Sequence, residues 1–136
     1  MIDVSKEIGK NLKRLFPDLK LYRNNVEGGF EEPSFLLQKI QSTSAPLTFG
    51  NQNRTYYYQL VYFPNPSNIA ADIDRVEATL LDYFTELENF AQLVNRQSKI
   101  NDQTLNFTFE VNIFAKVARE ETKQAKMEYQ GGINNG

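Results

Sequence analysis

The residues of this sequence with the greatest chemical potential are carboxylates, and three of them lie close together. Glu27, Glu31 and Glu32 fall within six residues. Oxygen ligands suit Mg²⁺ and Ca²⁺, and paired carboxylates can act as acid and base. However, the run lacks the spaced Asp and Asn ligands of a calcium loop, and no phosphate-binding lysine or nucleophile accompanies it. A solvated loop or an electrostatic contact with a partner therefore fits these residues better than a metal site.

Two residue types that dominate enzyme chemistry are absent, because the sequence contains no histidine and no cysteine. This excludes disulfides, thiolate metal sites and cysteine nucleophiles. It also removes the usual general base near neutral pH and the commonest transition-metal ligand. Ser5, Ser34 and Ser67 cannot be nucleophiles activated by histidine. The composition therefore favours a protein that is not an enzyme and holds no cofactor, and cytoplasmic folding is the default expectation.

Two patterns could bind nucleic acid or phosphate. Residues 54–63 combine one arginine with four tyrosines that could stack on bases, namely Arg54, Tyr56, Tyr57, Tyr58 and Tyr62. Such binding needs a basic groove, whereas 15 basic and 17 acidic residues give a net charge of -2. Gly28 and Gly29 lie between acidic residues that repel anions, so they indicate a structural turn. Aromatic packing within a sheet is the better interpretation of the tyrosines, and no specific nucleic-acid partner is expected.

The length of 136 residues suits one ordinary domain. The longest apolar runs are far shorter than the roughly 20 residues of a membrane span, so no membrane partner is expected. The first ten residues lack an apolar segment behind a basic head, so we expect no secretion signal.

Apolar spacing predicts two helices. Residues 3–16 form the first, with Asp3 or Ser5 as its cap and Pro17 as its stop. Residues 68–90 form the second, whose apolar stripe repeats at helical spacing through Ile69, Ile73, Val76, Leu80, Tyr83, Phe84 and Leu87. Its acidic residues lie mostly off this stripe and are expected to form a solvated face, with Asp72, Asp74 and Asp82 among them.

Alternating patterns predict five strands, at residues 19–23, 34–41, 54–63, 91–100 and 104–117. Strand 54–63 is apolar on both faces and is expected to be central and covered on both sides. Strand 104–117 should bury one face, formed by Leu105, Phe107, Phe109, Val111 and Ile113. Polar, turn-rich residues 42–53 predict a long loop, and residues 101–103 predict a turn.

The order of these elements is α-β-β-β-α-β-β. It predicts a single α+β domain at residues 1–118, in which two helices pack with a mainly antiparallel or mixed sheet. Residues 119–136 are charged and then rich in Gly and Asn, so they are predicted to form a flexible tail.

A set of motifs in this order resembles a known family. Residues 26–35 read Val26-Glu27-x-Gly29-Phe30-x-Glu32-Pro33-x-Phe35, and the tyrosine-rich strand closes in Tyr62-Phe63-Pro64. A long amphipathic helix and a late aromatic strand follow. Over roughly residues 1–117, the sequence resembles the small tail terminator proteins of tailed bacteriophages, Gram-positive prophages and phage-tail-like bacteriocin elements.

The resemblance implies a structural assembly role. Such proteins close into a homo-oligomeric ring, typically a hexamer, on the last ring of the tail tube. They stop tube polymerisation and present a surface to the head connector protein, and in contractile tails they anchor the sheath protein. The expected locations are the bacterial host cytoplasm during assembly and then the virion tail or tail-like particle. The alternatives are another head–tail connector or completion protein, or a prophage nucleic-acid-binding protein or Mg²⁺-dependent enzyme.

A closed head-to-tail ring needs two different patches on each subunit. We expect the turn at residues 26–33 and the loop at residues 42–53 to contribute to them. Phe30 and Phe49 are aromatics on loops, where apolar exposure indicates a partner, unless each folds back onto its own domain. The predicted interface residues are Glu27, Gly29, Phe30, Glu31, Glu32, Pro33 and Phe49.

Overall fold

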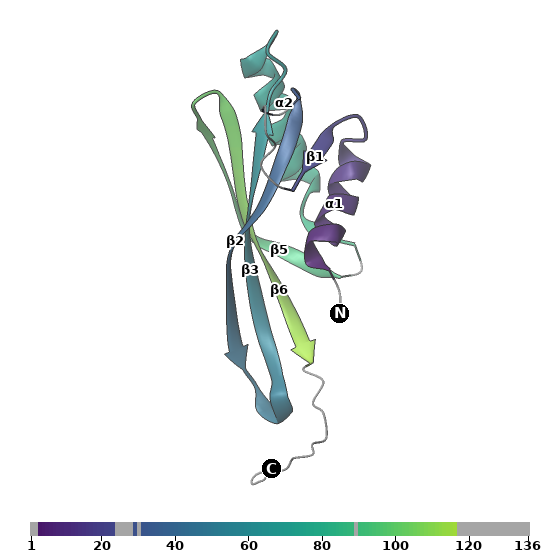
Figure 1. Ribbon diagram of the computed structural model, residues 1–136, viewed down its shortest axis with the longest axis vertical. Coiled ribbons are helices and arrows are strands. Elements are labelled where there is room, and N and C mark those ends of the chain that lie inside the picture. The colour runs from purple at the N-terminus through teal and green to yellow at the C-terminus, as the bar shows by residue number, and fades with distance from the viewer. Residues whose placement is uncertain (1–2, 24–28, 30, 89, 117–136) are drawn as a thin grey trace. The chain divides into compact units, whose positions relative to one another are not determined.

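The computed structural model describes residues 3–23, 29, 31–88 and 90–116. Within these residues, two α-helices and six strands form an α+β fold (Figure 1). The sheet order is β1-β2-β3-β6-β5-β4. Strand β1 pairs in parallel with β2, whereas β5 pairs antiparallel with both β4 and β6. The predicted α+β class is confirmed, and the sheet is of the mixed kind.

Contacts along the chain divide it into two compact units, which are described separately. The first unit comprises Met1–Thr43 and Thr55–Ile113, and it contains both helices. The second unit comprises Ser44–Arg54 and Phe114–Gly136.

Helix α1 spans Val4–Leu15, close to its predicted bounds. Asp3 is its N-cap, because its side chain accepts a hydrogen bond from the backbone N–H of Lys6 at 3.2 Å. Residues buried at helical spacing attach this helix to the sheet. The cap and the stop before Pro17 were therefore both readable from the sequence.

Helix α2 spans Ile69–Tyr83 and is shorter than predicted. The guanidinium of Arg96 donates to the carbonyl oxygens of Leu80, Leu81 and Phe84 at 3.1–3.4 Å, so it caps the carboxyl end of the helix. The apolar stripe continued past this end because the chain stays against the core as it turns into a further short strand.

The strands run from β1 to β6 as Lys20–Tyr22, Ser34–Pro46, Asn51–Phe63, Glu86–Leu87, Ala91–Asn101 and Thr104–Lys116. Strand β4, at Glu86–Leu87, was not predicted. The predicted loop at residues 42–53 is also wrong, because β2 and β3 extend through most of it. A short 3₁₀ turn, η1 at Thr48–Gly50, joins them. The residues there are polar and exposed on both faces, so alternation gave no strand signal.

The turn between β5 and β6 is confirmed. Asp102 and Gln103 have φ angles of 55° and 63°, the left-handed values of a two-residue hairpin turn.

The core lies on one face of the sheet, and both helices pack against that face. Directly after α1, Phe16 meets Phe35 on β2 with ring centroids 5.1 Å apart. After α2, Phe84 meets Phe109 on β6 edge-on at 5.3 Å, and Phe109 also stacks with Tyr58 of β3 at 5.6 Å. The predicted inward face of β6 is confirmed, with Ile113 only half-buried at its end.

The opposite face of β3 is only half-buried. Tyr57, Gln59, Val61 and Phe63 all retain intermediate exposure. The prediction that β3 is covered on both sides is therefore wrong for the described residues, because both helices lie on the other face.

Candidate interaction surfaces

The predicted turn at residues 26–33 is described in part. Glu27 and Phe30 lie outside the described residues. Gly29 is exposed and has a φ of 96°, a backbone conformation that side-chain-bearing residues rarely adopt. A glycine at this position thus follows from the backbone itself.

Glu31 links this turn to β1. Its carboxylate lies 2.9 Å from the ammonium of Lys20, and its backbone N–H donates to the Tyr22 hydroxyl at 3.5 Å. The hydrogen bond and charge of Glu31 raise the pKa of Lys20. Glu32 is exposed, and a cis peptide bond joins it to Pro33 just before β2 begins. The described part of the turn therefore presents carboxylates to solvent beside β1.

The tip of the β2–β3 hairpin exposes an aromatic side chain. The backbone N–H of Leu47 donates to the Asn51 carbonyl at 2.7 Å and closes the turn. Phe49 sits within it at φ 60° and is 92 % exposed. Within the described residues, Phe49 does not fold back onto its own domain.

Polar side chains brace this tip across its two strands. Ser44 and Arg54 both donate to the side-chain oxygen of Gln52, each at 2.9 Å. Two further apolar side chains of the second unit, Leu47 and Phe114, are also exposed. The second unit thus presents apolar side chains on a backbone held by paired strands and polar contacts.

Two of the four tyrosines of β3 are not available for stacking on bases. Tyr58 and Tyr62 are buried in the core. The Tyr58 hydroxyl lies 3.1 Å from Ser5 Oγ, and the Tyr62 hydroxyl donates to Asp72. Tyr56 packs under the ammonium of Lys39, 4.8 Å from the ring centroid. These contacts support the interpretation of the segment as sheet packing.

Asp72 ties the end of β3 to the start of α2. Its carboxylate accepts hydrogen bonds from the Tyr62 hydroxyl at 2.5 Å, the Asn65 backbone N–H at 2.9 Å and Arg75 at 2.8 Å. Burial raises the pKa of this carboxyl, but the three hydrogen bonds outweigh it and leave the pKa below its usual range. Burial raises the pKa of the Tyr62 hydroxyl, and the hydrogen bond and charge of Asp72 raise it further. The prediction of a solvated acidic face is therefore wrong for Asp72.

Among the described residues, no group of three or more acidic, histidine or cysteine side chains could hold a metal ion. No described helix is long and apolar enough to cross a membrane.

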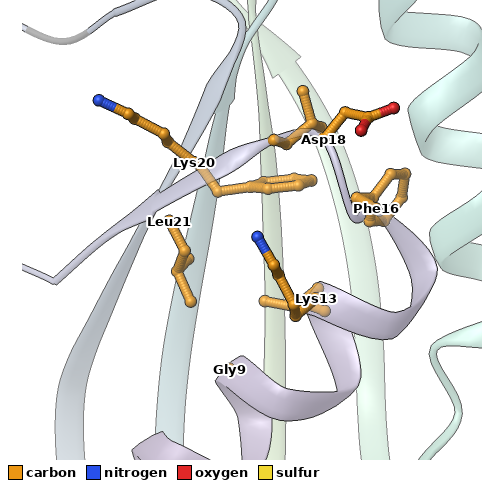
Figure 2. A pocket seen from close by; sticks show the side chains of 9 residues that line it. Gly9, Lys13, Phe16, Asp18, Lys20 and Leu21 are labelled. Carbon is orange, nitrogen blue, oxygen red and sulfur yellow. The ribbon is translucent and has the colours of Figure 1, made fainter.

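One feature that sequence reasoning missed is a pocket of about 400 Å³ where α1 meets β1 (Figure 2). Its lining is apolar with a charged rim, and consists of Gly9, Leu12, Lys13, Phe16, Asp18, Leu19, Lys20, Leu21 and Phe35. A Cβ at Gly9 would lie 3.4 Å from the Leu21 side chain, so this glycine permits close packing of α1 on β1. Gly9, a glycine within a helical pattern, was the one sequence signal for this close packing.

A family model described as phage tail terminator protein matches residues 3–125, which include every described helix and strand. No curated protein matches the sequence.

Proposed function

This chain belongs to the phage tail terminator family, and we propose that it closes into a homo-oligomeric ring, a hexamer, that caps the tail tube. The ring stops polymerisation of the tube and joins it to the head connector. The match over residues 3–125 carries this proposal, because the family is one of structural components of the phage tail.

Two surfaces support an assembly role. Phe49 projects from a braced hairpin tip with 92 % of its surface exposed, and a large exposed aromatic is a suitable anchor for a partner. The described part of the turn at residues 26–33 offers Gly29, Glu31, Glu32 and Pro33 beside β1. We assign these residues, with Glu27 and Phe30 from the same turn, to contacts with neighbouring subunits or the tube.

The role is structural and not catalytic, and it requires no cofactor. The partners are further copies of the chain, the tail tube protein and the head connector protein, and in a contractile tail the sheath protein. Assembly takes place in the bacterial host cytoplasm, and the ring remains in the virion tail or tail-like particle.

The test is a tube-length assay with purified tail tube protein. Addition of this chain is expected to stop elongation and to leave a ring at one end of each tube, visible by electron microscopy. Light scattering on the isolated chain or on capped ends should give the mass of a closed ring. A chain that stays monomeric even with tube protein contradicts the proposal, and binding to the portal side instead of the tube end indicates a head–tail connector.

A further inference from the structure

Charge is distributed unevenly between the two helical regions of the first unit. Residues 3–23 carry six basic and three acidic side chains, whereas residues 69–88 carry one basic and six acidic side chains. The net charge of the whole chain is only -2, so the composition conceals this separation. A head-to-tail contact between identical copies uses two different surfaces of each subunit, and surfaces of opposite sign suit such a contact.

The basic surface lies on α1 and beside it. Lys6, Lys10 and Lys13 are exposed and follow one another at i, i+4 and i+7, so they form one stripe along the helix. Lys10 pairs with Glu7 of its own helix, while Lys6 and Lys13 make no ion pair among the described residues. Lys13 also lines the pocket, and Figure 2 shows it rising from α1 between Leu21 and Phe16.

The pocket gives this basic surface an apolar centre. Phe16, Leu21 and Phe35 line it together with Lys13, which is unpaired among the described residues. Its rim also carries Asp18 and Lys20, which pairs with Glu31. We call the stripe and the pocket together the α1 surface. It suits an apolar side chain that is flanked by carboxylates.

The outward side of α2 has these properties. Leu81 is 40 % exposed, and the exposed carboxylates of Asp74 and Asp82 lie on the same side of the helix, at i−7 and i+1. Asp74 is exposed two turns earlier, and neither aspartate forms an ion pair among the described residues. We call Asp74, Leu81 and Asp82 the α2 surface.

The two surfaces lie on different helices that pack on the same face of the sheet, and Arg14 of α1 forms an ion pair with Glu88 after β4. The pocket borders β1, which is the first strand in the sheet order. In contrast, α2 is attached to β5 near the other edge, where Ser98 donates to Glu77 at 2.5 Å and Arg96 caps the helix. One copy can therefore offer its α1 surface to one neighbour and its α2 surface to another.

From this complementarity, we propose that the α2 surface of one copy docks on the α1 surface of the next copy. Leu81 covers the pocket, and Asp74 and Asp82 meet the lysine stripe. The occupant of the pocket is thus a second copy of this chain. This contact rests on the proposed ring and names the residues through which the ring closes.

Charge reversal tests the contact. The basic variant set is Lys6→Glu with Lys13→Glu, and the acidic variant set is Asp74→Lys with Asp82→Lys. Each set places like charges together across the contact, so each is expected to weaken self-association about tenfold or more, measured by light scattering and sedimentation. All four substitutions in one chain restore opposite charges and should restore assembly.

Mixing the two reversed chains gives a second test. One reversed chain is acidic on both surfaces, and the other is basic on both. Each surface of one chain therefore complements the facing surface of the other, so the mixture should form rings in which the two chains alternate. Lys99→Glu with Lys116→Glu is a matched control, because it reverses two exposed lysines outside both surfaces. This control should assemble like the wild type. Circular dichroism should show that every variant is folded.

The outcomes separate this contact from the ring itself. A wild-type chain that stays monomeric, alone and with tail tube protein, overturns the ring and this contact together. If the wild type forms rings and both charge-reversed variants also form them, this contact is overturned but the ring is not. The contact is also overturned if Lys6→Glu with Lys13→Glu abolishes capping of tubes but leaves ring formation intact. The α1 surface would then bind the tube and not the next subunit.

Discussion

The aromatic side chains beneath the helices and those at the hairpin tip have opposite environments. Phe109 is 1 % exposed and contacts Tyr58, Phe84 and Phe107. Phe49 is 92 % exposed and lies in a turn. Both residues are phenylalanines in strand-rich segments. Residue type alone therefore does not distinguish a core residue from an interface residue.

The difference teaches that each region has its own means of stability. Beneath the helices, ring contacts and burial of apolar surface stabilise the fold. At the hairpin tip, backbone pairing and the Ser44–Gln52–Arg54 hydrogen bonds hold the turn without Phe49. Substitutions in the first region should therefore change folding, and those in the second should change assembly.

The largest effect is expected from Phe109→Ala. Removing this ring leaves a cavity among three aromatic neighbours, so the free energy of unfolding should fall by about 3–5 kcal/mol. Urea denaturation followed by circular dichroism measures the change. A loss below about 1 kcal/mol would contradict the assignment of Phe109 to the core centre.

An intermediate effect is expected from Asp72→Asn, which removes the charge that accepts three hydrogen bonds. At pH 7 the free energy of unfolding should fall by about 1–2 kcal/mol. Asp74→Asn on the same helix is the matched control and should change it by less than about 0.5 kcal/mol.

The same carboxyl makes stability depend on pH. Its pKa is lower in the folded chain than in the unfolded chain, so its stabilisation is complete above the unfolded value of about 4. The stabilisation is lost as the pH falls through the folded pKa. Unfolding midpoints measured from pH 7 to pH 2 should therefore fall less steeply in Asp72→Asn than in the wild type. Equal slopes would show that Asp72 is not the titrating group.

The smallest effect on folding is expected from Phe49→Ala. Its ring is exposed, so the free energy of unfolding should stay within about 0.5 kcal/mol of the wild type. Ring formation or tube capping should weaken about tenfold or more, because an anchor of the contact is lost. Denaturation and the tube-length assay on one sample measure both. Loss of folding would show that Phe49 packs on its own domain.

Several elements were predictable because local chemistry determines them. The cap at Asp3, the turn at residues 101–103 and the buried face of β6 follow from side-chain type and spacing. The long strands through residues 42–53 were not predictable, because exposed polar residues carry no alternation there. The end of α2 was missed because Arg96, on a distant strand, caps it.

The sequence by itself determined the α+β class, the order of the main elements and the resemblance to tail terminators, since periodicity and motifs depend only on neighbouring residues. Tertiary structure alone decided the role of Asp72, the exposure of Phe49 and the pocket between α1 and β1. These depend on which distant segments meet, and burial and hydrogen bonding between such segments are set only when the whole chain packs.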